Sequence, residues 1–210
     1  MRTKTLLLTA ALSAAGVMAT MAAGVTSVNV VGYINVSVPP GFSFIANQLS
    51  AQNEKISALI AAPMDGTVVY TWKNGNFDPN AYNLFGDNTW DNPDTILTPG
   101  NGALIFNATA AAFTVTFVGE VKQGALKTTI PAGFSFISSQ VPQEGTVSAL
   151  GYAPKDGDIL YKWEKGNFSP YSFNLFGDNT WDPKEPTLGV GDSALLSSVG
   201  GSWDRTFNVP

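Results

Sequence analysis

The side chains best suited to chemistry in this sequence lie in two loops with the same nine residues. Asn-Leu-Phe-Gly-Asp-Asn-Thr-Trp-Asp occupies positions 83–91 and returns unchanged at 174–182. In the first loop, Asp87, Asn88 and Asp91 place three oxygen-bearing side chains within five positions. Clustered oxygen ligands without His or Cys suit a hard cation such as calcium, although their spacing differs from that of an EF-hand loop. The alternative interpretation is that these side chains cap turns by bonding to nearby backbone groups.

The same loops carry an aromatic residue that suits carbohydrate recognition. Trp90 and Trp181 stand among Asp and Asn side chains. An exposed ring can stack on the C–H face of a sugar while carboxylates and amides bind its hydroxyl groups. Burial of the two rings would remove the main support for this hypothesis, because large rings also fill the core of a small β unit. The ligand-binding residues expected on this basis are Asp87, Asn88, Trp90, Asp91, Asp178, Asn179, Trp181 and Asp182.

Catalytic chemistry is restricted by the absence of two residue types. The chain has no His and no Cys, which excludes a Ser-His-Asp triad, a thiol nucleophile, a zinc ribbon and a disulfide framework. Paired carboxylates remain, and Asp87 with Asp91 is the obvious pair for a glycosidase. Both copies carry that pair, and a small duplicated fold offers no evident deep cleft. We therefore expect no enzyme and no cofactor, with calcium as the one candidate ion and a carboxylate-based glycosidase as a remote alternative.

The charge balance argues against a nucleic-acid-binding protein. The 210 residues include 16 acidic and 11 basic residues, a formal net charge of −5, and the only two arginines are Arg2 and Arg205. Proteins that bind nucleic acids need a basic surface that neutralises phosphates. We therefore expect partners of another kind, such as a polysaccharide or other components of a cell surface.

The first two dozen residues have the pattern of a secretory signal peptide. A basic start with Arg2 and Lys4 precedes an apolar stretch over 6–17, and small residues follow around 22–24. We predict a signal peptide over 1–23, which leaves nine basic against 16 acidic residues and a net charge of −7. The apolar run is short for a membrane-spanning helix of about 20 residues, so we expect no transmembrane anchor after cleavage. The expected location is extracellular, at the cell surface or in the periplasm.

The remaining chain contains two copies of one module. Residues 41–45 return at 133–137 as Gly-Phe-Ser-Phe-Ile, and the aligned anchors keep an offset of 91 or 92 positions. About half of the aligned central residues are identical, so an unbroken match of nine residues indicates a functional constraint on that loop, unless recent duplication or demanding turn geometry produces it. We predict two β modules, over 24–118 and 119–210.

Within each module the apolar pattern is that of short strands. Alternation over 28–38 and 113–117 predicts half-buried strands, and the Asn-Gly pair within 72–77 predicts a hairpin. The apolar face of the preceding strand carries Trp72 and its counterpart Trp163, which we expect in the core. A short helix is expected around 56–60, with a weak echo near 147–150. The fold class is therefore all-β, with tandem sandwich-like or barrel-like units, and a single pseudo-twofold β-structure is the alternative.

Three segments of the first copy resemble a module of secreted bacterial proteins. They are Gly-Phe-Ser-Phe-Ile-Ala-Asn at 41–47, Val-Val-Tyr-Thr-Trp-Lys-Asn-Gly-Asn-Phe at 68–77 and Leu-Thr-Pro-Gly-Asn-Gly-Ala-Leu-Ile-Phe at 97–106. The two-copy form is similar to exported proteins of unknown function from Verrucomicrobia and related bacteria. The second copy departs from the pattern at 190–193, where Val-Gly-Asp-Ser replaces Pro-Gly-x-Gly. The resemblance implies export and a β-fold and supplies no catalytic residues.

Two functions follow from these observations. The first is an exported, non-enzymatic β-module protein that binds a glycan or another surface ligand through the loops around Trp90 and Trp181. The second is a structural envelope or matrix protein without a small ligand, in which those loops stabilise the fold or mediate self-association. Exposure of the two indoles distinguishes the two functions.

Overall fold

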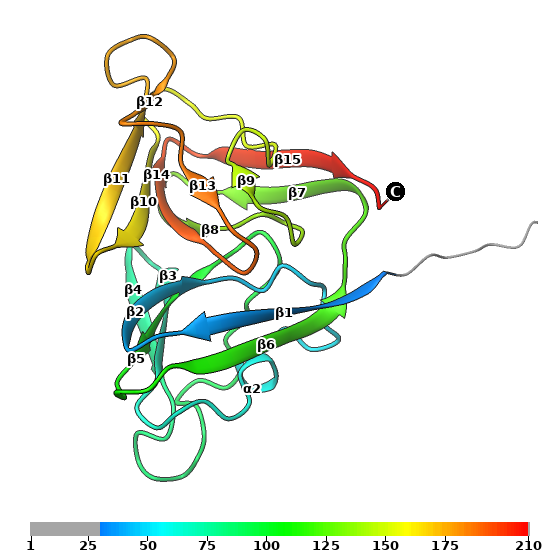
Figure 1. Ribbon diagram of the computed structural model, residues 1–210, viewed down its shortest axis with the longest axis vertical. Coiled ribbons are helices and arrows are strands. Elements are labelled where there is room, and N and C mark those ends of the chain that lie inside the picture. Colours follow the sequence, from blue (N-terminus) through cyan, green and yellow to red (C-terminus); the bar gives the residue numbers. More distant parts are fainter. Residues whose placement is uncertain (1–29, 210) are drawn as a thin grey trace, which may run out of the picture.

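The computed structural model describes residues 30–209, and they form an almost entirely β protein. Strands from the first half of the chain lie below those from the second half in Figure 1. The one helix in this part of the chain is α2 (Ile56–Leu59), a single turn. The all-β class predicted from the sequence is confirmed. The predicted signal peptide at 1–23 lies outside the described residues.

The first half folds into a sheet and a ribbon. The sheet has the strand order β2 (Gly41–Ile45), β5 (Ala103–Asn107), β3 (Val68–Lys73) and β4 (Asn76–Ala81). The ribbon pairs β1 (Val31–Val38) with β6 (Phe113–Glu120) in antiparallel register. Every second side chain of β1 is exposed, as the alternation in the sequence predicts.

The second half repeats this arrangement with small additions. Its sheet has the order β12 (Trp181–Asp182), β11 (Asn167–Phe173), β10 (Ile159–Glu164), β14 (Ala194–Ser198) and β8 (Gly133–Ile137). One ribbon pairs β7 (Gly124–Ile130) with β15 (Gly201–Phe207), and a short one pairs β9 (Gly145–Thr146) with β13 (Thr187–Leu188). Without β12, both sheets have the same strand order. β6 ends at Glu120 and β7 begins at Gly124, and the module bounds 24–118 and 119–210 stay a prediction.

The predicted hairpin is present in both halves. Asn74 and Gly75 connect β3 to β4 with φ angles of 52° and 80°. A two-residue turn of this primed type needs positive φ at both positions, which Asn and Gly tolerate. Lys165 holds the place of Asn74 with φ 51°. The predicted helical echo near 147–150 is a hydrogen-bonded turn in which the Leu150 amide donates to the Thr146 carbonyl at 3.0 Å.

Each half has its own apolar core, and a third cluster joins them. Ile45, Val69 and Phe117 belong to the first core, and Leu160 and Trp203 to the second. The third cluster lies between the two sheets. Its buried members are Phe44, Leu104, Phe136 and Leu195, and its partly buried ones are Phe42, Tyr70, Trp72, Tyr161 and Trp163. Trp72 and Trp163 are therefore half-buried at the junction of the halves, whereas the sequence predicts them in the core.

Contacts across this junction come in reciprocal pairs. The ring centroids of Phe42 and Trp163 lie 5.2 Å apart, and the same distance separates Phe134 from Trp72. The backbone repeats the relationship, because the Ala46 amide donates to the Gly191 carbonyl at 2.9 Å and the Ser138 amide donates to the Gly100 carbonyl at 3.0 Å. Such reciprocity is what the pseudo-twofold alternative leads one to expect.

The described residues include no helix that is long and apolar enough to cross a membrane.

Candidate functional site

The two tryptophans of the repeated loops are buried. Trp90 is 3% exposed and Trp181 is 9% exposed. The indole N–H of Trp90 donates to the Ile60 carbonyl at 2.9 Å, and its ring packs on Tyr82 with centroids 5.5 Å apart. Trp181 packs on Phe173 at 5.4 Å. Neither indole face is available to a sugar, so ligand binding by these loops loses its main support.

The predicted oxygen ligands of the first loop hold a turn. Asn83 Oδ1 accepts the Asn88 amide at 2.7 Å, and Asp87 Oδ1 accepts the Thr89 amide at 3.1 Å. Asn88 is itself in the left-handed region, with φ 57°. The hydrogen bonds from Thr89 lower the pKa of the Asp87 carboxyl. These contacts agree with the turn-capping interpretation.

The second loop repeats the turn bond for bond. Asn174 Oδ1 accepts the Asn179 amide at 2.7 Å, and Asp178 Oδ1 accepts the Thr180 amide at 3.1 Å. The pKa of Asp178 is lowered for the same reason as in the first loop. The two loops therefore use the same hydrogen bonds. This shared turn geometry accounts for the identity of these Asn, Asp and Thr residues in both copies.

The remaining predicted site residues are the two aspartates that end the repeated loops. Asp91 and Asp182 are exposed and follow the buried tryptophans, and Asp182 precedes a cis-proline. Within residues 30–209, no group of three or more His, Cys, Asp or Glu side chains is placed to hold a metal ion.

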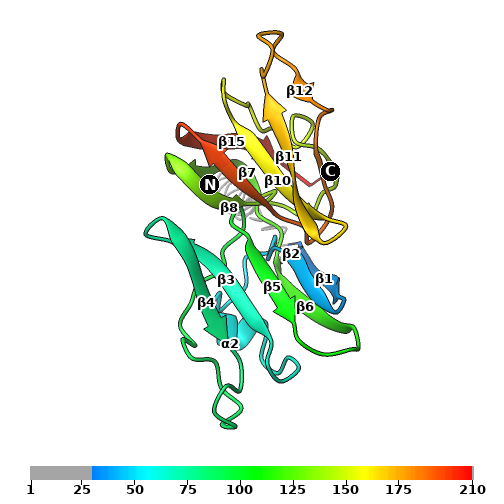
Figure 2. The same cartoon turned by 90° about the vertical axis from the view of Figure 1, so that its left-hand side faces the viewer.

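In each repeated loop, two side chains take no part in the hydrogen bonds of the turn. The side chains of Leu84 and Phe85 in the first loop, and of Leu175 and Phe176 in the second, are exposed. Phe85 is 82% exposed and Phe176 is 77% exposed. The two loops stand at opposite ends of the long axis of the molecule (Figures 1 and 2). We call these pairs the Leu-Phe tips.

A groove in the first half lies between the end of α2 and β6. It has a volume of about 300 Å³ and is lined by residues 58–63 and 113–116. The corresponding hollow of the second half has only about 10 Å³. Tyr152, which stands where the first copy has Ala61, is buried there against Trp203 at 5.3 Å. The first groove therefore lacks an aromatic ring that the second contains.

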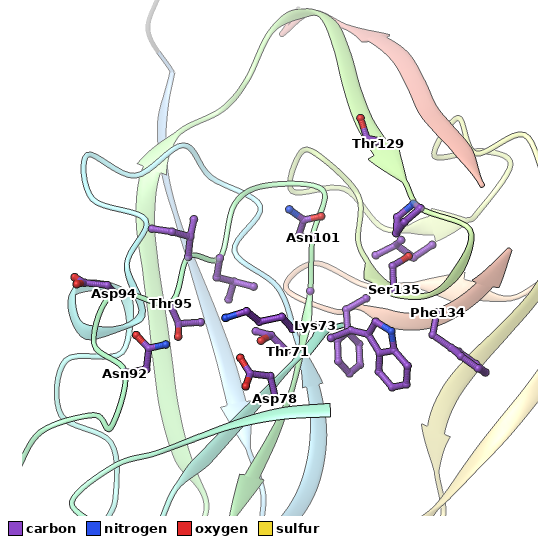
Figure 3. Close-up of a pocket in the computed structure, with 17 residues that line it drawn as sticks. Thr71, Lys73, Asp78, Asn92, Asp94, Thr95, Asn101, Thr129, Phe134 and Ser135 are labelled. Carbon is purple, nitrogen blue, oxygen red and sulfur yellow. The ribbon is translucent and has the colours of Figure 1, made fainter. Parts of the chain in front are cut away.

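A larger cleft lies between the two halves on one side of the junction. Its volume is about 490 Å³. The first half contributes Thr71, Lys73 and Asp78 together with the loop 92–97, as Figure 3 shows, and the second half contributes residues from 129 to 137. Trp72 and Phe134 lie at the same cleft, in contact with each other.

The cleft presents polar groups that lack partners within the described protein. No hydrogen bond from another described residue reaches the side chains of Lys73, Asp78 or Asn92, and Ser135 Oγ is buried without a partner in this part of the chain. Asp94 forms an ion pair with Lys55 at 2.7 Å. The cleft therefore combines balanced charges with groups free to bind a polar molecule.

The corresponding place on the other side of the junction is occupied. Lys162, the counterpart of Thr71, lies 3.3 Å from the Asp192 carboxylate and donates to the Thr187 carbonyl at 2.7 Å. Asp192 and Thr187 are the counterparts of Asn101 and Ile96, which line the open cleft. Burial raises the pKa of Asp192, and Lys162 opposes that shift. The Lys162 side chain therefore fills, on this side of the junction, the space that is open on the other side.

Sequence reasoning missed this cleft because its residues are scattered from 71 to 137. A signal was nevertheless present. Thr71 against Lys162 and Asn101 against Asp192 are two changes between copies that create a charged pair in the second. Paired changes of this kind point to positions that are close in space.

Comparison with protein-family models, with curated proteins and with solved structures finds no match to this chain.

Proposed function

We propose that this is an exported, non-enzymatic structural protein of the cell envelope or extracellular matrix, which assembles with further copies of itself through the Leu-Phe tips. The observation that carries this proposal is the exposure of Phe85 and Phe176 at opposite ends of the molecule. Export rests on the signal-peptide pattern of 1–23.

The identity of the nine-residue loops supports this proposal, because the turn and the core account for only some of the identical residues. Asn83, Asp87 and Asn88 take part in the turn bonds, and Trp90 fills the core. The Leu-Phe pair takes part in neither, yet it is the same in both copies. Large apolar side chains held in water cost free energy, and contiguous exposed apolar surface marks an interaction site.

The placement of the tips favours other copies of the chain over a lipid surface. Tips at opposite ends of a rigid body cannot both touch one flat membrane, whereas each can contact a different neighbour. The net charge of −7 that we predict for the exported form also opposes binding to anionic headgroups. A protein with two such ends can link neighbours into chains.

The groove at α2 is the site that we assign to a tip from another copy. In the second half the corresponding hollow is filled by the Tyr152 ring, so an aromatic ring suits this geometry. A phenylalanine from a neighbouring molecule would supply that ring in the first half. Contact between two different surfaces of identical chains forms a ring where the rotation between neighbours closes, and extends into a chain of molecules where it does not.

Light scattering on the exported protein tests the proposal. We expect a mass that grows with concentration for the wild type and a monomer for the double variant Phe85→Ser/Phe176→Ser. A matched control is Val199→Ser, which removes an exposed apolar side chain away from both tips. A wild type that stays monomeric at all concentrations would contradict the proposal, as would equal association by the double variant.

A further inference from the structure

We propose that the cleft between the halves is a binding site for a neutral oligosaccharide. The site is distinct from the Leu-Phe tips and from the loops that carry Trp90 and Trp181. Its lining includes Trp72 and Phe134, whose rings contact each other, and the polar side chains of Lys73 and Asp78 (Figure 3).

The size of the cleft fits a ligand of several sugar units. Its volume of about 490 Å³ falls within the roughly 300–1,000 Å³ of small-molecule sites. The Trp72 ring is half-buried, and it is held by Phe77 at 4.9 Å and by Phe134 at 5.2 Å. Because the indole is already held in place, stacking of a pyranose C–H face on it would cost less side-chain entropy than stacking on a free ring.

The charges of the cleft select a neutral ligand. Lys73, Asp78 and Asp94 are the charged residues that line it, and Asp94 is already paired with Lys55. The local sum of these four charges is zero, so neither an anion nor a cation is favoured as a whole. Carboxylate, amide and hydroxyl groups in such a site bind sugar hydroxyls by hydrogen bonds.

Ser135 supplies an independent indication that the site is incomplete. Ser135 belongs to the lining of the cleft, and its Oγ is buried without a hydrogen-bond partner among the described residues. Buried polar groups are nearly always satisfied in folded proteins. A rotation of the Ser135 side chain toward the cleft would let a ligand hydroxyl satisfy this one.

The second half shows how the same site is closed. Lys162 and Asp192 form their ion pair where the first side has Thr71 and Asn101. The variant Thr71→Lys/Asn101→Asp therefore introduces the same ion pair into the open cleft. The second half tolerates this pair in an equivalent backbone, so the variant is expected to fold.

Isothermal titration calorimetry with four neutral hexasaccharides, built from glucose, mannose, xylose or N-acetylglucosamine, tests the inference. We expect at least one of them to bind with one site per chain, and Thr71→Lys/Asn101→Asp to weaken that binding at least tenfold. Circular dichroism spectra and melting curves confirm that the variant is folded. The reverse variant Lys162→Thr/Asp192→Asn leaves the open cleft intact and serves as the matched control, with binding at the first site retained.

Three results would overturn the inference. They are the absence of binding by all four hexasaccharides, binding that the closed variant retains in full, and a preference for an anionic hexagalacturonate over every neutral ligand. The double variant of the Leu-Phe tips is expected to bind the sugar as the wild type does, so this test is independent of self-association.

Discussion

Gly102 and Ser193 occupy equivalent positions in the two halves and face each other across the junction. A Cβ atom added to Gly102 would lie 2.2 Å from the Cβ of Ser193. The Ser193 hydroxyl donates to the Ala103 carbonyl at 3.2 Å. The junction therefore has room for one side chain at this point and cannot hold a side chain at both positions.

This relationship predicts a rescue by residue exchange. Gly102→Ser should lower the free energy of unfolding by about 2–3 kcal/mol because two side chains overlap in a packed interior. Ser193→Gly alone should cost about 1 kcal/mol, the value of a lost hydrogen bond. Urea unfolding of the exchanged variant Gly102→Ser/Ser193→Gly should recover most of the loss. An exchange that is as unstable as Gly102→Ser would show that the two positions do not compete for space.

A second prediction separates the fold of the repeated loop from its exposed tip. Trp90→Ala should lower the free energy of unfolding by about 3–5 kcal/mol, because it empties a core position and removes the bond to Ile60. Phe85→Ala should change stability by less than about 0.5 kcal/mol, as expected for an exposed side chain. Thermal unfolding of both variants is the measurement. A large loss of stability in Phe85→Ala would show that Phe85 stabilises the fold, and its exposure would then no longer support a role in assembly.

The third prediction concerns acid. Hydrogen bonds from Thr89 and Thr180 lower the pKa values of Asp87 and Asp178 in the folded protein. Such carboxylates stabilise the fold above their unfolded pKa, and that contribution is lost as the pH falls through the lower folded pKa. The stability advantage of the wild type over Asp87→Asn/Asp178→Asn should therefore shrink as the pH falls below 3.8. Denaturant unfolding across that pH range measures this difference in the free energy of unfolding. A difference that grows on acidification would contradict the hydrogen bonds that we assign to the two carboxylates.

Asp192 should respond to pH in the opposite direction. Its pKa is raised by burial, with Lys162 acting against the shift, so the folded protein binds the proton more tightly than the unfolded chain does. Ionisation therefore costs stability as the pH rises through the folded pKa. Relative to Asp192→Asn, the wild type should gain stability on acidification from neutral pH to below 3.8. A relative loss over the same range would mean that the Lys162 ion pair outweighs burial.

Much of the fold could be predicted from local patterns, because strands and tight turns depend on neighbouring residues. Alternation predicts β1 to within three residues, and Asn74-Gly75 predicts its hairpin. The burial of Trp90 could not be predicted in this way, since its indole reaches the carbonyl of Ile60, 30 positions earlier in a different segment. The polar neighbours of the tryptophan point outward and conceal this from a local pattern.

The candidate sites show the same limit. Thr71 and Asn101 come to line one cleft only in the folded chain, and Phe134 lines it from the other half. The exposure of Phe85 depends on a turn that directs a large apolar side chain into water. Neither property follows from residue spacing, because both depend on tertiary structure.

A fifth prediction places the receptor for the tips. Ala61→Phe supplies to the groove the ring that Tyr152 supplies in the second half. The variant should be at least as stable as the wild type, because it fills a hollow, and it should block entry of a tip from another copy. Leu126→Phe, at a half-buried position of β7 that does not line the groove, serves as the control for an added ring. Normal assembly by a folded Ala61→Phe would exclude the groove as the receptor.

Sedimentation velocity over a concentration series tests the central claim most directly. The claim predicts species larger than a monomer for the wild type, intermediate association for Phe85→Ser and for Phe176→Ser alone, and monomers for the double variant and for Ala61→Phe. A single monomeric boundary for the wild type at every concentration, or identical association by all five proteins, would contradict it.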